Sequence, residues 1–292
     1  MSEVYAAPAA LLRCARVRVC TLGDLLLDVI VRLEQPLAPG GDSPAETRVG
    51  AGGQAANVAA WVAALGAEAR LVGKRGDDAA GALAADRLST LGVEVVGPVE
   101  PGSTGVVVSL VDTRGERTMA SDRGVAPELA PEELDAAWFA DCDRLHVSGY
   151  SLLAEPIGAT AVRAAEETHA AGGLVSVDLP PWSVIERSGA EPLRARLRAI
   201  APEVVFATER EAELLADRAA GVRVLKLGDR GCAVETDGRR IELPAVRAEV
   251  VDTTGAGDAL AAGFLLGGSV EEAAQRGLAT AARAVAKLGA MP

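Results

Sequence analysis

Aromatic and basic side chains are scarce in this sequence. Phe, Trp and Tyr together make up 3% of the residues, and lysine occurs at only three of 292 positions. The formal net charge is −12 without a long basic run, which excludes a general nucleic-acid-binding surface, because phosphate backbones require many Lys and Arg contacts. No apolar stretch reaches 18 residues, so no transmembrane helix or membrane partner is expected. Since 49% of the residues are hydrophobic, we expect a globular core built from Ala, Val and Leu.

Cysteine and histidine are also few. The cysteines Cys14, Cys20, Cys142 and Cys232 form no C-x-x-C pair, and the chain has only two histidines, so no zinc-site pattern is present. Free thiols are typical of a reducing cytoplasm. The N-terminal stretch has no basic region before its short apolar run, which Pro8 interrupts, so no signal peptide is expected. These features predict a cytoplasmic protein.

Strands alternate with helical segments over most of the chain. Apolar strand patterns occur at residues 17–22 and 69–73, and again at 144–148, 174–178, 204–207 and 222–227. Helical patterns fill most of the intervals, and this alternation is typical of a parallel sheet with crossover helices. We therefore predict an α/β fold with a doubly wound, mostly parallel sheet flanked by helices. Residues 1–292 are expected to form a single domain.

Four strand-like segments lack crossover helices between them. They lie near residues 27–33, 45–49, 104–112 and 117–121, and the last two flank a turn that contains glycine. Such segments are expected to form a small separate sheet over the carboxyl ends of the main strands. We predict that the segments about 27–49 and 104–121 form a β-sheet lid, which would exclude water during a transfer reaction.

The first glycine-rich motif is Gly50-Ala51-Gly52-Gly53-Gln54-Ala55-Ala56-Asn57. It matches the pattern G-x-G-x-x-A of dinucleotide-binding oxidoreductases, but the preceding strand is short and polar. No carboxylate stands about 20 residues later to hold a ribose. Two other interpretations remain: a loop whose backbone approaches a ligand, with the Asn57 amide pointing at it, or a tight turn before a helix.

The second motif is Val251-Asp252-Thr253-Thr254-Gly255-Ala256-Gly257-Asp258, which leads into an apolar helix. Small residues at a helix N-terminus leave backbone N–H groups free to bind an anion such as a transferred phosphoryl group. Asp258 falls in the first helical turn, where a carboxylate also simply stabilises the helix. Beside a phosphate site, however, it is placed to take the proton of an attacking hydroxyl. Neither the P-loop pattern nor the protein-kinase motifs occur, and no G-x-S-x-G supports a hydrolase.

These two motifs carry a family resemblance. From about residue 17 to the C-terminus, the chain resembles the ribokinase-like, or PfkB, family of sugar and nucleoside kinases. Residues 52–57, through Gly73 and Gly76-Asp77, are similar to the N-terminal signature of the family. Residues 252–258 are similar to its C-terminal signature, which is highly specific. The resemblance implies an ATP-dependent kinase that phosphorylates a hydroxyl of a small sugar or sugar-like substrate.

The resemblance also implies roles for the matching positions around the acceptor. Asp258 would be the catalytic base, and the backbone of Gly255, Ala256 and Gly257 would form the anion hole. Substrate hydroxyls would be held by Asp28, Gly53, Gln54 and Asn57. Asp24, a carboxylate in the turn after the first strand, is a further candidate, although such a residue is about equally often a turn former.

Nucleotide and metal positions follow in the same way. The segment Lys226-Leu227-Gly228-Asp229-Arg230-Gly231 is similar to the family's nucleotide-binding strand and turn, so Lys226, Gly228 and Gly231 are implied to bind ATP. Thr208 stands where the family often has Asn in Asn-x-x-Glu, and Glu211 keeps the acidic position, which implies Mg²⁺. Asp252 and the carbonyl of Thr254 match a site for a monovalent cation such as K⁺.

Substrate and assembly remain open at this level. Gln54 and Leu26 replace polar residues of ribokinases, so a nucleoside kinase is an alternative to a sugar kinase. A sensor that binds a sugar or nucleotide without catalysis is a second alternative, although binding alone needs no base at Asp258. Lids of this family often pair, which implies a homodimer through the lid, with residues 106–110 as its apolar face.

Overall fold

A computed structural model describes residues 17–215 and 220–292. The N-terminal stretch assessed above for a signal peptide, including Cys14, lies outside the described residues. None of the described helices is long and apolar enough to cross a membrane.

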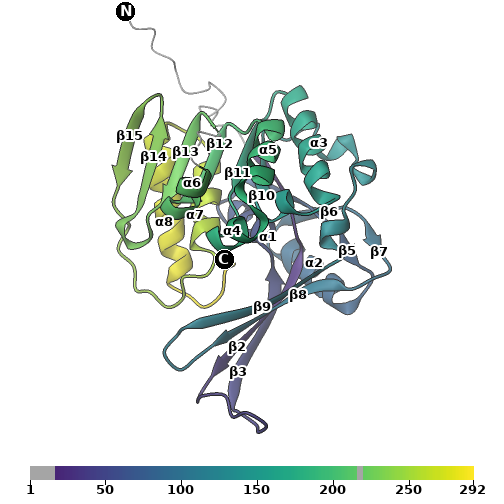
Figure 1. The fold of residues 1–292 in the computed structure, drawn as a ribbon, viewed down its shortest axis with the longest axis vertical. Coiled ribbons are helices and arrows are strands. Elements are labelled where there is room, and N and C mark those ends of the chain that lie inside the picture. The colour runs from purple at the N-terminus through teal and green to yellow at the C-terminus, as the bar shows by residue number, and fades with distance from the viewer. Residues whose placement is uncertain (1–16, 216–219) are drawn as a thin grey trace, which may run out of the picture.

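A nine-stranded sheet forms the centre of the molecule (Figure 1). Its strand order is β15-β14-β13-β12-β11-β10-β1-β4-β6. The strands from β13 to β6 in this order are parallel, whereas β14 and β15 are antiparallel to their neighbours. The bounds are β1 (Arg18–Leu22), β4 (Glu68–Val72), β6 (Val93–Val96), β10 (Arg144–Ser148), β11 (Leu174–Asp178), β12 (Val204–Thr208), β13 (Val222–Lys226), β14 (Cys232–Thr236) and β15 (Arg239–Leu243).

Helices cover both faces of this sheet because the side chains of each strand alternate between them. Val19, Phe206 and Val224 pack in one cluster with α1, α7 and α8, whereas Cys20 and Val205 pack in a second cluster with α3 to α6. The helices are α1 (Gln54–Ala64), α2 (Ala79–Thr90), α3 (Ile157–Ala170), α4 (Trp182–Ser188), α5 (Ala190–Ile200), α6 (Glu209–Leu215), α7 (Ala256–Leu265) and α8 (Val270–Val285). Short 3₁₀ turns are η2 (Ala126–Glu128), η3 (Pro131–Glu133), η4 (Ala136–Trp138), η5 (Ser151–Leu153) and η6 (Gly228–Arg230).

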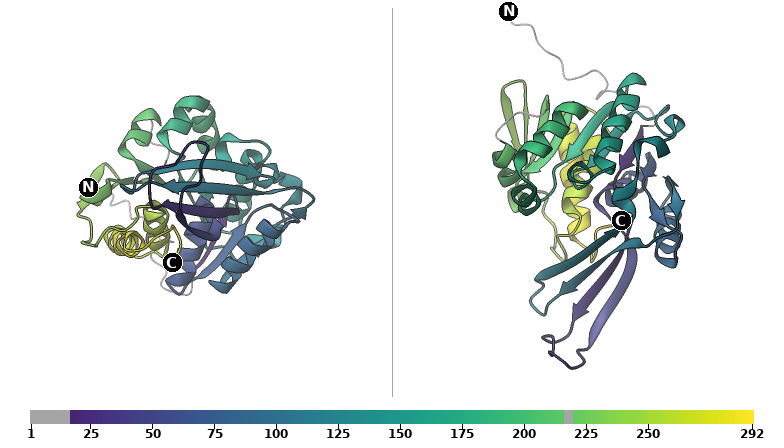
Figure 2. Two further views of the ribbon diagram at one scale, coloured as in Figure 1. Left: turned by 90° about the horizontal axis from the view of Figure 1, so that it is seen from below. Right: turned by 45° about the vertical axis from the view of Figure 1, so that its right-hand side comes forward.

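A smaller sheet projects from one end of this body (Figures 1 and 2). It has the order β3-β2-β8-β9 and contains β2 (Leu26–Leu33), β3 (Ala45–Gly52), β8 (Thr104–Val111) and β9 (Arg117–Gly124). Two short parallel strands, β5 (Arg75–Gly76) and β7 (Val99–Glu100), form a third sheet. The predicted fold class, a mostly parallel sheet flanked by helices with a small separate sheet, is confirmed.

Two parts of the large sheet were not predicted from the sequence. The edge strand β6 follows α2, and the hairpin β14–β15 extends the opposite edge. The turn of that hairpin consists of Asp237 and Gly238, which both have positive φ angles, 48° and 75°. A two-residue Asp-Gly turn between strand-like segments is a strong hairpin signal, and it was the feature that would have revealed this element.

The carboxyl ends of the parallel strands meet at one edge of the large sheet. The residues at or just after these ends include Asp24 after β1, Ser148 of β10, Asp178 of β11, Thr208 of β12 and Lys226 of β13. In open α/β sheets this edge is where ligands bind, because the loops and helix N-termini there face a common crevice.

Candidate active site

The start of α7 is shaped by a glycine. Gly255 caps the helix with φ 71°, and no side chain caps the first turn. A Cβ atom on Gly255 would lie 2.7 Å from the backbone of Ala290, so a larger residue would displace the C-terminal segment. Gly257 follows, and a Cβ there would lie 3.3 Å from Cδ of Lys226. Backbone N–H groups at an uncapped helix N-terminus beside an ammonium group suit an anion.

Asp258 lies in the first turn of α7 and meets a residue from α1. The Nδ2 atom of Asn57 donates a hydrogen bond of 2.8 Å to Oδ2 of Asp258 across 201 residues of sequence. Burial of the carboxyl raises the pKa of Asp258 to about 7, and the negative charge of Asp178 adds to this rise. The hydrogen bond from Asn57 and the charge of Lys226 act in the opposite direction. A carboxyl with a pKa near neutrality is well matched to accepting a proton from a hydroxyl.

Lys226, whose side chain is 18% exposed, forms an ion pair with the buried Asp178 beside Asp258. The Lys226 Nζ atom lies 2.6 Å from Oδ1 of Asp178, whose side chain is fully buried. Burial alone would lower the pKa of Lys226, but the charges of Asp178, Glu211 and Asp258 outweigh it and the pKa is raised. Lys226 is therefore a fixed positive charge beside the start of α7. Asp178 was not among the predicted site residues, although a carboxylate at the carboxyl end of a buried strand was a usable signal.

Asp28 of β2 lies over the glycines that precede α1. A Cβ on Gly52 would be 2.0 Å from Oδ1 of Asp28, so only glycine leaves room for this carboxylate. Burial raises the pKa of Asp28 to about 6, and its charge in turn contributes to the raised pKa of Asp258. Gly53 has φ 101°, and a Cβ there would meet the carbonyl oxygen of Asp24 at 2.2 Å. The glycines thus allow the small sheet and α1 to approach closely.

Gln54 and Asp24 already have protein partners. Ser148 donates a hydrogen bond of 2.6 Å to Oε1 of Gln54 at the end of β10. Asp24 accepts two hydrogen bonds from Arg123 of β9, at 2.6 and 2.9 Å. The guanidinium of Arg123 is also close enough to Tyr150 to affect its pKa, which burial and the charge of Asp258 raise. A cation from the small sheet therefore lies near the centre of the site.

Thr208 and Glu211 are joined to each other at the start of α6. The backbone N–H of Thr208 donates to Oε2 of Glu211 at 2.7 Å, and the N–H of Glu211 donates to Oγ1 of Thr208 at 3.3 Å. This reciprocal arrangement is a capping box. It fixes the carboxylate of Glu211, a buried residue, close to Lys226.

A pocket of about 530 Å³ lies beside the start of α7. Three of the predicted nucleotide-binding positions line it, Lys226, Gly228 and Gly231, whereas Thr208 is not among its lining residues. The remaining lining is mostly apolar and comes from the loop after β15, from α7 and from α8, including Val246, Ala248, Leu260, Leu278 and Ala282. A mostly apolar pocket that also contains an ammonium group and the start of a helix suits a base and its attached phosphates.

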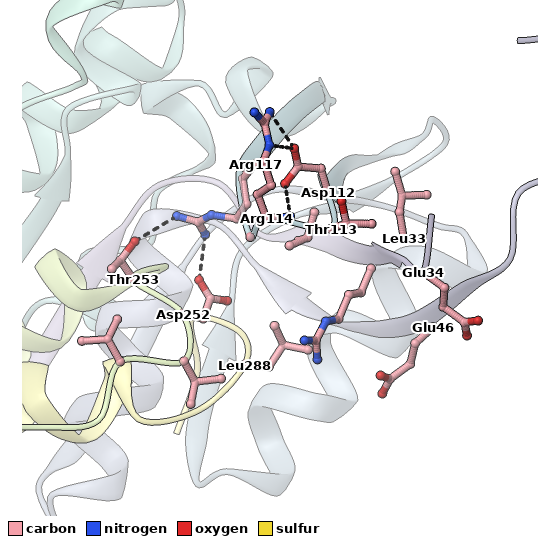
Figure 3. Close-up of a pocket in the computed structure, with 15 residues that line it drawn as sticks. Leu33, Glu34, Glu46, Asp112, Thr113, Arg114, Arg117, Asp252, Thr253 and Leu288 are labelled. Carbon is pink, nitrogen blue, oxygen red and sulfur yellow. Dashed lines mark hydrogen bonds and ion pairs between the residues drawn. The ribbon is translucent and has the colours of Figure 1, made fainter. Parts of the chain in front are cut away.

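Asp252 connects three separate segments. Its Oδ1 atom accepts hydrogen bonds from the backbone N–H (2.9 Å) and the hydroxyl of Thr254, and its Oδ2 atom accepts one of 2.9 Å from the N–H of Gly289. Nη1 of Arg117, from β9, lies 3.2 Å from Oδ1. Figure 3 shows the Arg117 guanidinium between Asp252 and Thr253, at one side of a cavity of about 660 Å³ beneath the small sheet.

The contacts described above place predicted site residues in two groups. Asp258, Asn57 and Lys226 form one cluster of direct or electrostatic contacts, to which the charges of Asp28 and Glu211 contribute. Asp252 and Thr254 form a second group, to which Arg117 was an unpredicted addition. The sequence offered no signal for Arg117, because its partners lie more than 130 positions away.

Comparison with known proteins gives matches along nearly the whole chain. The model of the pfkB family carbohydrate kinases matches residues 17–292. An ATP-dependent ribose-1-phosphate kinase of Halopiger xanaduensis is 36% identical over 290 residues, which cover 94% of this chain and 94% of that protein. Fructokinase-1 of Oryza sativa subsp. japonica is 31% identical over 270 residues, covering 85% of this chain and 81% of that protein.

Solved structures agree with these matches. The crystal structure of adenosine kinase from Sinorhizobium meliloti superposes with a TM-score of 0.84 at 28% identity, covering 95% of this chain and 96% of that one. Fructokinase with bound ATP from Xylella fastidiosa superposes with a TM-score of 0.80 at 25% identity, with 95% and 96% coverage. Both the sequence comparison and the structure comparison therefore find kinases, and fructokinases occur in both.

Proposed function

The chain belongs to the pfkB family of carbohydrate kinases, and from this premise we propose that it transfers the γ-phosphoryl group of ATP to a hydroxyl of a small sugar or sugar-like substrate, with Asp258 as the general base. The observation that carries this proposal is the setting of Asp258. Its carboxyl has a pKa of about 7, stands in the first turn of α7, and adjoins the charge of Lys226. A base is needed only where a proton is removed, so this setting favours catalysis over simple binding.

The chemical step uses these residues in order. The acceptor hydroxyl, held near Asp28 and Asn57, transfers its proton to Asp258 as its oxygen attacks the γ-phosphorus in line with the leaving ADP oxygen. The backbone N–H groups of Gly255 to Gly257 receive the negative charge of the transferred group. Lys226 adds a nearby positive charge, which the ion pair with Asp178 holds in place.

Binding of Mg²⁺ with ATP is part of the proposal. Within residues 17–215 and 220–292, no cluster of three or more His, Cys, Asp or Glu side chains provides a ready-made metal site. Glu211 nevertheless offers a buried carboxylate near Lys226, and Oδ2 of Asp178 is buried without a hydrogen-bond partner among the described residues. These hard oxygen donors fit a Mg²⁺ that the nucleotide brings, with Glu211 holding it directly or through water. When bound, Mg²⁺ would neutralise part of the negative charge of the ATP phosphates.

The small sheet is proposed to act as the lid of a single domain. It contributes Asp28 and Arg123, and its closure over the strand ends would exclude water from the transfer. Asp28 pairs with Val107 in register, so Val106, Val108 and Leu110 lie on the opposite face, where they are only half-buried. We propose this face as the contact of a homodimer.

The buried free thiols at Cys20, Cys142 and Cys232 support a cytoplasmic location.

Among acceptors, a phosphorylated ribose is the first candidate. The relative from Halopiger xanaduensis, at 36% identity, is named a ribose-1-phosphate kinase. Arg123, whose Nε and Nη2 atoms pair with Asp24, adds support because it places a positive charge near the acceptor that would attract a phosphate group. A nucleoside is the alternative, since the similar structure from Sinorhizobium meliloti is an adenosine kinase. A non-catalytic sensor is the second alternative.

The test is ADP release from ATP and Mg²⁺ in the presence of ribose 1-phosphate, ribose, fructose or adenosine. Asp258→Asn should lower turnover by about 10²–10⁴-fold with the best acceptor. Asp86→Asn, an exposed carboxylate on α2, is the matched control and should retain full turnover. Full activity of Asp258→Asn would overturn the mechanism. Ligand-induced stabilisation without turnover of any acceptor would favour the sensor.

A further inference from the structure

Asp252 stands where the family resemblance implies a monovalent cation, but its surroundings fit a different occupant. Its side chain is 6% exposed, and each carboxylate oxygen already accepts a hydrogen bond from the backbone N–H of Thr254 or Gly289. The guanidinium of Arg117 also approaches Oδ1, with its Nη1 atom 3.2 Å away in an ion pair that is not a hydrogen bond. A K⁺ ion on the same oxygen would stand next to a guanidinium of like charge.

Both the backbone and the side chain of Arg117 make contacts that place it here. It begins β9, where it pairs with Val111 of β8, and its side chain is 25% exposed. Its Nη2 atom also contacts Oγ1 of Thr253 at 3.5 Å, as Figure 3 shows. The guanidinium brings a positive charge to this position.

We propose that the Arg117 guanidinium replaces the monovalent cation and that phosphoryl transfer in this protein is independent of K⁺. The inference rests on the proposed kinase function, since it concerns the same anion hole. It adds a residue, from the small sheet, that the motifs do not contain.

The contacts of Asp252 explain how Arg117 would affect the anion hole. Asp252 fixes the backbone N–H of Thr254, the residue before Gly255. Through Gly289 it also fixes the segment that packs against Gly255, where Ala290 is the contact. The positive charge of Arg117 beside Asp252 therefore helps to hold the loop before α7, whose N–H groups are proposed to bind the transferred phosphoryl group. Arg117 is a positioning residue, because its effect passes through Asp252.

The anchor also joins two parts of the molecule. Arg117 belongs to the small sheet, whereas Asp252 and Thr253 belong to the loop before α7. A free cation would leave these two parts independent. With Arg117 in its place, the position of β9 and the shape of the anion hole are linked.

The first test compares monovalent cations. Wild type, Arg117→Ala and Arg117→Lys are assayed in KCl, NaCl and choline chloride at about 0.1 M, so that screening is equal. Wild-type turnover should vary by less than about twofold. Arg117→Ala should lose about tenfold or more in turnover in choline chloride, as expected for a lost ion pair, with little change in the KM for the acceptor. Addition of K⁺ should restore the turnover of this variant. Arg117→Lys should keep most of the turnover in all three salts.

A second readout does not require turnover. The melting temperature of Arg117→Ala should rise in KCl relative to choline chloride, because the vacated carboxylate then binds K⁺, whereas that of the wild type should not. Arg114→Ala is the matched control, since Arg114 lies in the same hairpin with a side chain that is 80% exposed and bonds only locally to Asp112. It should behave as the wild type in both assays.

Two results would overturn the inference. One is a wild type that needs K⁺ for turnover or is stabilised by K⁺ over choline. The other is an Arg117→Ala variant whose melting temperature and turnover do not respond to K⁺. If no acceptor is phosphorylated in any salt, the proposed kinase function fails, and the melting temperatures alone decide between these results.

Discussion

Replacing Asp258 with asparagine should stabilise the protein at alkaline pH while it removes activity. In the unfolded chain this carboxyl ionises near its ordinary pKa of 3.8, but in the folded protein only near 7. Between these values the folded state holds the extra proton, so raising the pH costs the wild type stability. Above pH 7 the cost is constant. Asparagine cannot ionise, so Asp258→Asn escapes the whole penalty.

The size of the effect follows from the shift. A rise of about three pKa units corresponds to an upper limit of about 4 kcal/mol at pH 8, since one unit is worth about 1.36 kcal/mol. Relaxation around the ionised carboxylate will lower this value, and we expect about 1–3 kcal/mol. The advantage of the variant should shrink to below about 1 kcal/mol at pH 4, near the unfolded pKa. Asn57 can still donate its hydrogen bond to the asparagine oxygen, so little packing is lost.

The assay is urea unfolding of the wild type and Asp258→Asn at several values between pH 4 and pH 8. Asp86→Asn serves as control, because its carboxyl is exposed on α2 and its stability difference should not change with pH. In the wild type, kcat/KM should also fall about tenfold per pH unit well below pH 7, as the base becomes protonated. A stability difference that is independent of pH, or a variant less stable at pH 8, would refute the argument that Asp258 is strained by burial.

Two further predictions concern the neighbours of Asp258. Gly52→Ala should raise the KM for the acceptor by about ten- to a hundredfold without changing the KM for ATP, because the new Cβ displaces the Asp28 carboxylate. Gly50→Ala is the control in the same steady-state kinetic assay, and it should leave both constants unchanged because a Cβ there has nothing within 4 Å. Lys226→Met should lower the free energy of unfolding by about 3–5 kcal/mol, because the buried charge of Asp178 loses its partner. Urea unfolding of the double variant with Asp178→Asn should recover part of that loss; equal stability of the single and double variants would contradict the pairing.

The elements that carry the motifs could be predicted from local sequence. Apolar runs of five or so residues, separated by helical segments, indicated the parallel strands because strand and helix periodicities are local properties. The start of α7 was also marked locally, by successive small residues that precede an apolar helix. What local patterns missed were β6 and the β14–β15 hairpin. β6 is only four residues long and β15 is polar and mostly exposed, but the apolar start of β14 and the Asp237-Gly238 turn were usable signals.

The sequence by itself determined which residue types the site contains: the glycines of the two motifs, Asn57, Asp258 and the basic Lys226. Only the tertiary structure decided their chemistry. Asp258 has a pKa near 7 because folding buries it beside Asp178, and its hydrogen bond to Asn57 spans 201 positions. Likewise, Arg117 reaches Asp252 because β9 is held beside β8, far from the loop in sequence. Burial and long-range pairing set charge and proton affinity, and neither is a property of neighbouring residues in the chain.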